Sequence, residues 1–455
     1  MLGADSADDS LIDPADLAPP LAMPSPDARA ALRERMQRSG QWHDHQMAGR
    51  RWPVACVSLE ITQRCNLDCT LCYLSEASEA VRDLPLEEVM RRIELIHAHY
   101  GPGTDVQVSG GEPTLRRRDE LLAIVARLRE RGLRASLFTN GIKAGRELLT
   151  ALAQAGLTDV AFHVDTTQQR SGYASEADLN ALRREYIERA RGLPLHVFFN
   201  TTVHAGNVAE VPMLARFFVE QADGVDFASF QLQAETGRGV QGARSGAVSN
   251  ESIAELLSQG AGTALTFNAL LAGHAQCNRG AVMLVANGRA HDAFADTAFV
   301  ARFMRATAGL AIERGTTWRG VASLVRAAVA RPRLAAASLR WAAALTWRLR
   351  ADLFAAGGRA HKLTFFTHNF MDANALDRER IDACVFMAMT QHGPISMCAY
   401  NARRDHYLLQ PIATSQGVWQ PLAGRGRAGE AAVFPIRFLK GRSRAAALAE
   451  REGAR

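Results

Sequence analysis

Three cysteines stand close together near the start of the chain, spaced by four and three positions: Cys65, Cys69 and Cys72. Thiolates are the ligands of iron–sulfur clusters, which normally take four of them. Three thiolates leave one iron without a protein ligand, and an open coordination position is what a cosubstrate needs. A zinc site would need a fourth Cys or His, and none follows nearby in the sequence. The spacing therefore predicts an iron–sulfur cluster with one open iron, rather than a zinc knuckle or inert thiols.

A glycine-rich motif, Gly110-Gly111-Glu112-Pro113, follows one strand–helix unit after the cysteines. Glycines let a backbone approach a ligand closely, and carbonyls together with a carboxylate accept hydrogen bonds from an ammonium group. With the aromatic Tyr73 directly after Cys72, and with Thr139-Asn140-Gly141 further on, these motifs resemble the radical S-adenosylmethionine (SAM) superfamily. The resemblance covers roughly residues 54–235.

That resemblance implies a 4Fe–4S cluster on the three cysteines, with SAM chelated by the open iron. It implies reductive cleavage of SAM to methionine and a 5′-deoxyadenosyl radical, which takes hydrogen from an unactivated C–H bond, and an electron donor such as flavodoxin or ferredoxin. The residues that it implies at SAM are Tyr73, Gly110, Gly111, Glu112, Pro113, Asn140, Asp165 and Asn200. For Asp165 and Asn200, a helix-capping Asp and a barrel-interior Asn are open alternatives. No catalytic acid or hydrogen donor is singled out.

Four further cysteines lie outside the triplet. Cys56 lies early in the first predicted strand and is expected to be a buried small side chain. Cys384 and Cys398 are symmetric about Gln391, the centre of a predicted hairpin turn, which would bring their Cβ atoms to roughly 4.5–5.5 Å. Together with Cys277 they predict an auxiliary iron–sulfur cluster, the alternative being buried free thiols. His368, His392 or a substrate atom are open as its fourth ligand.

The C-terminal part carries a second resemblance, over about 35 residues. His368-Asn-Phe-Met-Asp372, Asp377-Arg-Glu-Arg380, Cys384 and Cys398-Ala-Tyr-Asn401 resemble the branch that holds archaeal tetraether lipid synthases and radical SAM dihydropterin methyltransferases. The resemblance implies C–C bond formation or methylation of a lipid or small molecule. The chain departs from that branch in having no cysteine before Cys56. A maturase that modifies a ribosomal peptide and a non-catalytic iron–sulfur or SAM-binding module are the alternatives.

The elements that must position these residues alternate between strand and helix. The predicted strands are Val54–Thr62, Asp105–Ser109, Arg134–Thr139, Asp159–Asp165, Leu195–Val203 and Asp226–Leu232, and the predicted helices are Pro85–His99, Arg118–Arg131, Gly145–Ala155, Glu176–Arg191 and Ala209–Gln221. Such alternation indicates βα units around a parallel sheet, with function in the loops after the strands. Six units predict an α/β fold, a partial (β/α)6 TIM-like barrel of the radical SAM type.

The remaining sequence divides around this core. We expect a disordered or loosely packed arm (1–50), the core barrel (51–240), a C-terminal extension (241–423) and a basic tail (424–455). The extension is predicted to hold two hairpins, one turning at Asn287-Gly288 and one at Gln391–Pro394, and a helical insert at 300–360.

The insert carries most of the basic character of the chain. Residues 302–359 contain eleven arginines against two acids, in a protein of net charge +6. Tryptophan beside arginine on an amphipathic helix fits a membrane surface, and a helical lid with solvated arginines is the alternative. No apolar run reaches the ~18 residues of a membrane span, and the acidic N-terminus does not read as a signal peptide. We therefore expect a cytoplasmic protein, peripheral at the inner membrane face if the insert binds lipid, with no nucleic-acid partner.

Overall fold

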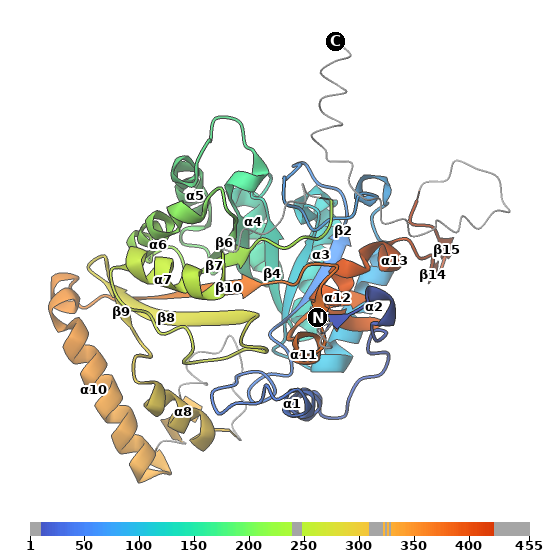
Figure 1. The fold of residues 1–455 in the computed structure, drawn as a ribbon. Helices are drawn as coiled ribbons and strands as arrows, with labels where there is room; N and C mark the ends of the chain where they lie inside the picture. Colours follow the sequence, from blue (N-terminus) through green and yellow to red (C-terminus); the bar gives the residue numbers. More distant parts are fainter. Residues whose placement is uncertain (1–10, 239–247, 309–321, 324, 327–328, 423–455) are drawn as a thin grey trace, which may run out of the picture.

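One open sheet of 11 strands organises the structure, in the order β13-β12-β2-β3-β4-β5-β6-β7-β10-β8-β9 (Figure 1). The structure is a computed structural model that describes residues 11–238, 248–308, 322–323, 325–326 and 329–422. The basic tail (424–455) therefore lies outside the described residues. The strands β13 and β9 form the two edges, so the sheet curves without closing on itself.

Six parallel strands form the core of this sheet, and each pairs with the next along the chain. They are β2 (Cys56–Thr62), β3 (Asp105–Gly110), β4 (Arg134–Thr139), β5 (Leu157–His163), β6 (His196–Val203) and β7 (Phe227–Leu232). The helices between them are α2 (Leu86–Tyr100), α3 (Arg118–Glu130), α4 (Arg146–Ala155), α5 (Glu176–Ala190) and α6 (Val211–Glu220). The predicted α/β fold with six strand units is confirmed.

Apolar side chains at helical spacing hold these helices on the sheet. In α3, Leu121, Ile124, Val125 and Leu128 are all buried. From the sheet side, Phe162 and Phe199 pack against each other, and Phe199 packs against Phe218 of α6. The face of the sheet that the helices cover, its outer face, is therefore apolar. The opposite, inner face is the one that can carry polar groups and ligands.

A seventh parallel strand, β10 (His361–Asn369), was not predicted. It pairs in parallel with β7 and antiparallel with β8 (Asn278–Ala286), so the C-terminal part continues the sheet of the core. The hairpin of β8 and β9 (Arg289–Asp292) turns at Asn287-Gly288, as predicted, with both residues at positive φ. Two helices flank this region, α7 (Asn250–Ala261) and α8 (Thr297–Ala306).

The second predicted hairpin forms with a different register. Its strands are β12 (Phe386–Thr390) and β13 (Gly393–Ser396), and β12 adds in parallel to β2. The register pairs Met387 with Ser396, which puts Cys398 opposite Val385 rather than Cys384. The second arm also ends at Ser396, where α12 (Met397–Ala402) begins, so the predicted pair of facing cysteines is wrong.

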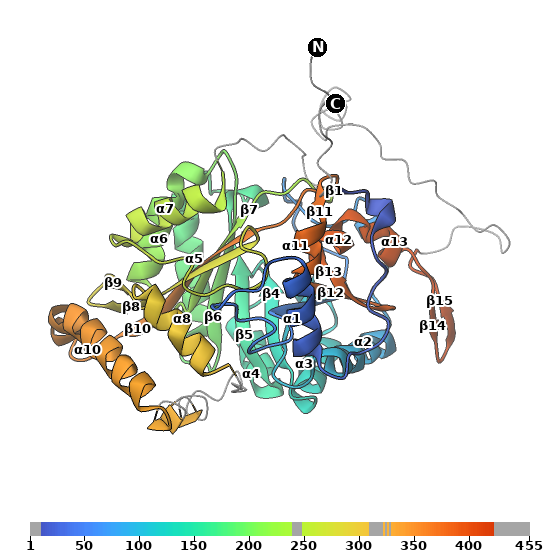
Figure 2. The same ribbon diagram turned by 60° about the horizontal axis from the view of Figure 1, so that its bottom comes forward.

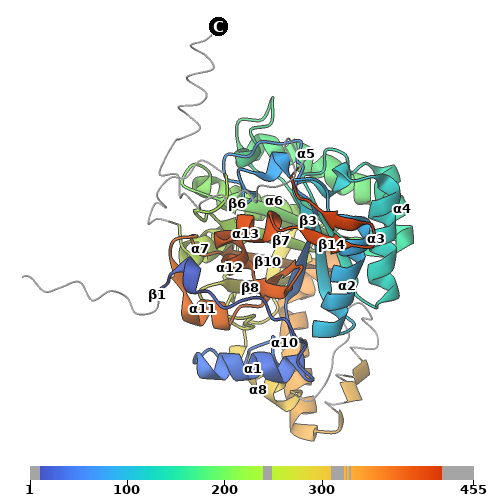
Figure 3. The ribbon, with the colours of Figure 1, turned by 90° about the vertical axis from the view of Figure 1, so that its right-hand side faces the viewer.

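The C-terminal helices lie against the sheet (Figure 3). The other short elements of this part are β11 (Leu376–Asp377), α11 (Arg378–Asp382), α13 (Arg404–Leu408), β14 (Ile412–Thr414) and β15 (Gly417–Trp419). The N-terminal segment differs from a loose arm, because β1 (Leu11–Ile12) pairs with β11 and α1 (Ala28–Arg38) buries Leu32 and Met36. Leu32 and Met36 are the two large apolar side chains of α1, so the composition of the N-terminal segment did not indicate this helix.

The predicted helical insert contains α8 and the long helix α10 (Pro332–Ala355). Residues 309–321, 324 and 327–328 of the insert lie outside the described residues. Within the described ranges, none of the helices combines the length and the hydropathy of a membrane span.

Candidate functional site

The loop that carries Cys65, Cys69 and Cys72 follows β2 and is held by the ends of neighbouring strands. After β4, the Asn140 side-chain Nδ2 donates to Asn66 Oδ1 at 2.7 Å. After β5, the backbone N–H of Thr70 donates to the carbonyl of Thr167 at 2.8 Å. Asn66 and Thr70 both lie between cysteines of the loop. The cysteine loop is therefore held by the segments that follow β4 and β5.

The far side of the same loop is held by β7 and the segments after β7 and β10. Tyr73 accepts a hydrogen bond from Gln231 of β7, and its ring meets Phe370 edge-on at 5.4 Å between centroids. Arg238 donates its backbone N–H to the carbonyl of Leu74 at 2.7 Å. Tyr73 therefore anchors the cysteine loop to β7 and to the segment after β10.

The three thiols are partly buried and close enough to influence one another. Burial raises the pKa of Cys65 and Cys69, and the neighbouring Cys72 raises both pKa values further. Thiolates in such surroundings need a cation to balance them, which iron supplies. In the part of the chain that the structure describes, no three His, Cys, Asp or Glu converge as ligands of a single metal ion. A 4Fe–4S cluster differs from that arrangement, because each thiolate binds its own iron.

The glycine motif packs directly on the chain that leads into the cysteine loop. Gly111 donates its N–H to the carbonyl of Thr62 at 2.9 Å, and Glu112 donates its N–H to the carbonyl of Arg64 at 2.8 Å. A Cβ on Gly111 would fall 2.2 Å from the Arg64 carbonyl oxygen, and a Cβ on Gly110 would fall 2.0 Å from that of Thr62. Both positions therefore require glycine, and Pro113 then begins a short 3-10 turn, η3 (Pro113–Leu115).

Gly111→Ala is expected to lower SAM cleavage by roughly 100-fold, because the backbone before Cys65 must shift and an ångström-scale shift at an active site can cost that much. The matched control is Gly145→Ala, since a Cβ there meets nothing within 4 Å. Both rates are measured by the 5′-deoxyadenosine formed under reducing anaerobic conditions. Equal rates in the two variants would contradict the requirement for glycine.

The Glu112 carboxylate is fully buried and engaged by the protein itself. Its Oε1 accepts from the N–H of Thr114 at 3.0 Å and from the hydroxyls of Thr114 and Thr139 at 2.5 and 2.8 Å. Its Oε2 accepts from the N–H of Asn140 at 2.7 Å. Glu112 thus ties the glycine motif to the end of β4, which leaves backbone carbonyls as the acceptors on this motif.

Asp165 is the buried cap of the turn η4 (Thr166–Gln168), which is the capping alternative left open above. Its carboxylate accepts from the N–H groups of Thr167 and Thr202, and it contacts His163 Nε2 at 2.6 Å. His163 and the hydrogen bonds hold the pKa of Asp165 below its usual range despite burial. Since Thr167 holds the cysteine loop, Asp165 acts on that loop through the η4 turn.

Asn200 of β6 is buried to about nine-tenths, and its side-chain amide has no hydrogen-bond partner among the described residues. The strand alternation puts its side chain on the face opposite Phe199, which packs under the helices. A carboxamide at the inner face can donate to and accept from a bound molecule. Asn200 therefore remains a candidate contact of SAM or substrate.

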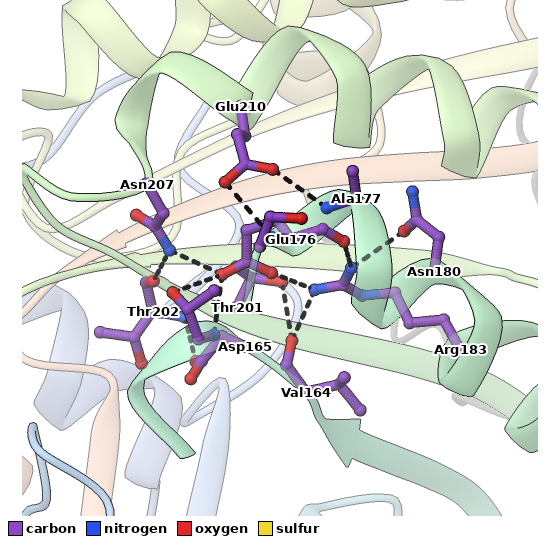
Figure 4. A network of polar contacts seen from close by, with 12 residues as sticks. Val164, Asp165, Glu176, Ala177, Asn180, Arg183, Thr201, Thr202, Asn207 and Glu210 are labelled. Carbon is purple, nitrogen blue, oxygen red and sulfur yellow. Dashed lines mark hydrogen bonds and ion pairs between the residues drawn. The ribbon is translucent and has the colours of Figure 1, made fainter. Parts of the chain in front are cut away.

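A buried ion pair contacts the segment that leads from β5 into the η4 turn (Figure 4). Arg183 and Glu176 are both inaccessible to solvent and meet at 2.5 Å. Arg183 also donates to the carbonyl of Val164 at 2.8 Å, and Glu176 accepts from Thr166 and from Asn207 Nδ2. These bonds join β5, α5 and the loop after β6, so they fix the segment that carries Asp165.

Arg183→Met is expected to lower the free energy of unfolding by about 3–5 kcal/mol, because it leaves the buried Glu176 without its cation. The control is Arg38→Met, which breaks an exposed pair with Glu34 and should cost at most about 1 kcal/mol. Urea unfolding of the iron-free protein measures both changes. A loss for Arg183→Met no larger than for the control would contradict a structural role.

The structure brings the three C-terminal cysteines into one region, in which Cys398 is buried and Cys277 and Cys384 are partly buried. Burial raises the pKa of Cys277 to about 11 and also raises the pKa of Cys398, and the nearby Cys384 adds to both shifts. Cys277 accepts a hydrogen bond from Arg380 Nε at 3.2 Å, and Cys398 accepts from the N–H of Met371 at 3.4 Å. Cys56, at the start of β2, is buried as expected.

Of the two candidate histidines, His368 lies in this region and His392 does not. His368 is buried at the end of β10, and both of its ring nitrogens lack a hydrogen-bond partner. Burial and the nearby Arg380 lower its pKa to about 3, so it is a neutral imidazole with a free lone pair. His392 sits in the turn of the β12–β13 hairpin, where it bonds to Gln410.

One buried cluster at the inner face was not found from the sequence. Glu60 of β2 accepts from Tyr400 at 2.9 Å, from Arg404 Nη1 at 2.6 Å and from Gln63 at 2.9 Å. Tyr400 and Arg404 come from the C-terminal helices α12 and α13. These bonds attach the extension to the strand that leads into the cysteine loop.

Part of this chain is similar in sequence to known proteins. Residues 59–217 match the family described as the Radical SAM superfamily, whose cofactors are a 4Fe–4S cluster and SAM. Among curated proteins, 7,8-dihydro-6-hydroxymethylpterin dimethyltransferase of Methanocaldococcus jannaschii is 29% identical over 188 residues, 40% of this chain and 37% of that protein. PqqA peptide cyclase of Xanthomonas oryzae pv. oryzae is 32% identical over 191 residues, 39% of this chain and 48% of that protein.

Among solved structures, Streptococcus suis SuiB bound to SAM is 15% identical and has a TM-score of 0.35, covering 45% of this chain and 46% of that chain. The chain thus spans less than half the length of each of these three proteins. The radical SAM resemblance is confirmed for the segment that carries the cysteine loop, the glycine motif and Asn200.

Proposed function

We propose that this chain, whose residues 59–217 form a radical SAM domain, is an enzyme that cleaves SAM reductively and removes hydrogen from an unactivated C–H bond. One observation carries the proposal: the loop of Cys65, Cys69 and Cys72 is fastened by the ends of β4, β5 and β7. A loop held from three sides keeps the positions of its thiols without help from a ligand. That is the preorganisation that a reactive centre requires.

In this proposal the three thiolates hold the 4Fe–4S cluster. When bound, the cluster and SAM together supply the 5′-deoxyadenosyl radical. The backbone carbonyls of Gly110 and Gly111 accept hydrogen bonds from the amino group of SAM, since Glu112 is engaged by four protein donors. The free amide of Asn200 binds the ribose or the carboxylate of SAM. Asp165 and Glu112 act as positioning residues for the loops that make these contacts.

We also propose a second iron–sulfur cluster on Cys277, Cys384 and Cys398, with His368 as its fourth ligand. The support is the donor set: three neighbouring thiols and one buried neutral imidazole whose two nitrogens are unpartnered. A buried polar group without a partner costs free energy, and a metal ligand bond would offset that cost. Arg380 would balance the negative charge of the thiolates.

For the substrate we propose a lipid or a small molecule with a large apolar part, joined or methylated at carbon. A row of partly exposed aromatic rings supports this class: Phe198 contacts Phe227, and Phe227 contacts Phe366, at 5.2 and 5.5 Å between centroids. Phe366 in turn stacks near His368, which brings the row to the end of β10. A maturase that modifies a ribosomal peptide is the alternative, supported by the similarity to PqqA peptide cyclase.

The test is anaerobic reconstitution with iron and sulfide, followed by SAM and dithionite. Formation of 5′-deoxyadenosine and methionine is expected, and its absence in protein that holds the cluster would favour a binding module. Deuterated saturated fatty acyl lipids and candidate peptides are then compared by deuterium transfer into 5′-deoxyadenosine. Transfer from a peptide alone would contradict the lipid or small-molecule class.

A further inference from the structure

The long helix α10 lies at the margin of the molecule, outside β8, β9 and α8 (Figures 1 and 2). One of its faces is packed on the protein: Leu345 and Leu349 are buried, and Trp341 stacks on Phe299 at 5.5 Å between centroids. Trp341 also donates its indole N–H to the carbonyl of Ala293 at 3.0 Å. The orientation of the helix about its own axis is therefore fixed.

The opposite face of α10 exposes large apolar side chains. Leu339, Trp347 and Phe354 are 71%, 66% and 89% exposed. A helix turns about 100° per residue, so these three positions fall within an arc of roughly 80°. They form one stripe along the helix, which is named the outer stripe below.

This stripe is exceptional for the molecule. Ten large hydrophobic side chains are exposed among the described residues, and five of them lie between Val325 and Phe354. The other five, Leu11, Leu21, Met23, Ile142 and Val418, are scattered over other parts of the surface, as is normal for a protein. A concentrated and unpartnered apolar stripe marks a contact surface.

The charges beside the outer stripe are all positive. Arg333, Arg340 and Arg350 are exposed on the same helix, and the Arg350 guanidinium lies over the Trp347 ring, 3.9 Å from its centroid. The helix has one acid, Asp352, which points to the sheet and bonds to His291 Nε2 at 2.9 Å. Within the described part of the chain, no carboxylate pairs with Arg333, Arg340 or Arg350.

We propose that the outer stripe and its arginines dock α10 flat on the surface of an anionic lipid bilayer. Helices that lie in the interface plane combine Trp, Phe and Leu on one face with basic residues beside it. With 24 residues, α10 is about 36 Å long, enough for both ends to contact the interface. A second copy of the chain fits less well, because it would bring two arginine-rich faces together. The proposal does not depend on the chemistry proposed for the core.

The test is co-sedimentation of the full chain with large vesicles of phosphatidylcholine alone or with one-third phosphatidylglycerol. We expect binding to the anionic vesicles, weak binding to the neutral ones, and weaker binding as salt rises. Trp347→Glu/Phe354→Glu should reduce partitioning by roughly tenfold or more. The matched control is Met23→Glu/Val418→Glu, which changes two exposed apolar side chains elsewhere. Arg333→Gln/Arg340→Gln should weaken binding to the anionic vesicles only.

Thermal melting and iron content of each variant establish that it is folded before its binding is compared. Lack of binding to anionic vesicles by the wild type would overturn the proposal. Equal losses in the α10 variant and the control would also overturn it. The proposal would also be overturned if light scattering showed a dimer that the Trp347→Glu/Phe354→Glu variant does not form, because a second copy of the chain would then cover the outer stripe.

Discussion

Cys69→Ala is expected to lower SAM cleavage by more than about 100-fold and to remove about four irons per chain. At metal sites, removing a residue that only hydrogen-bonds to a ligand lowers metal affinity or activity by roughly 10–100-fold. Cys69 is proposed as a direct ligand, so its loss should cost more. Cys69 lies between Asn66 and Thr70, the two residues of its loop that β4 and β5 hold. The loop should therefore keep its shape in the variant, so that the defect reports on the missing thiolate.

The measurements for Cys69→Ala are iron and sulfide per chain and 5′-deoxyadenosine formed under anaerobic reduction. Cys56→Ala is the matched control, because it makes the same change at a buried thiol remote from the loop. Iron content and cleavage should stay at wild-type levels in the control. Retention of both quantities in Cys69→Ala would contradict the assignment of this thiol as a ligand.

The core of the fold was predictable because each βα unit is encoded within a short stretch of sequence. The strand β4 has the predicted bounds, and the other five core strands differ by one or two residues at their ends. The cysteine loop and glycine motif could be placed relative to each other because the carboxyl ends of parallel strands share one edge. Their contact, Glu112 N–H to the Arg64 carbonyl, follows from that shared edge.

Contacts between distant parts of the chain could not be predicted in the same way. Glu60 and Tyr400 are 340 residues apart, and neither the strand nor the helix pattern indicates that they meet. The strand β10 did leave a signal, a run of β-branched and aromatic residues in Leu363–Thr367, but its place between β7 and β8 depends on tertiary pairing. The hairpin register was missed by one position because a two-residue turn, Gln391-His392, replaces the predicted longer one.

The corrected register changes how Cys384 and Cys398 work together. As a facing pair on adjacent strands, they would have been placed to form a disulfide as readily as a metal site. Instead Cys384 precedes β12, and Cys398 lies in the first turn of α12, so they approach the same region from two elements. Cys277 and His368 approach from before β8 and from the end of β10. Four elements that each bring one donor are better suited to a cluster than to a crosslink.

Cys384→Ala/Cys398→Ala is therefore expected to reduce the iron content from about eight to about four per chain while SAM cleavage continues. The residual irons belong to the cluster on Cys65, Cys69 and Cys72, which the double variant leaves intact. The reciprocal comparison is Cys69→Ala, which should keep the C-terminal irons and lose cleavage. Four irons in both the wild type and the double variant would contradict a second cluster and leave these thiols as structural.

The role of His368 can be separated from that of the thiols by its effect on the reduction potential. Histidine in place of cysteine raises the potential of an iron–sulfur centre, because a neutral ligand adds no negative charge. His368→Cys should keep about eight irons and lower the potential of the second centre in an EPR-monitored redox titration. The rings of Phe370 and Phe386 pack on the imidazole, with centroid distances of 4.0 and 4.4 Å. A smaller side chain at this position therefore also removes packing contacts. His368→Leu fills the same space without a donor, so an unchanged potential in both variants would exclude His368 as a ligand.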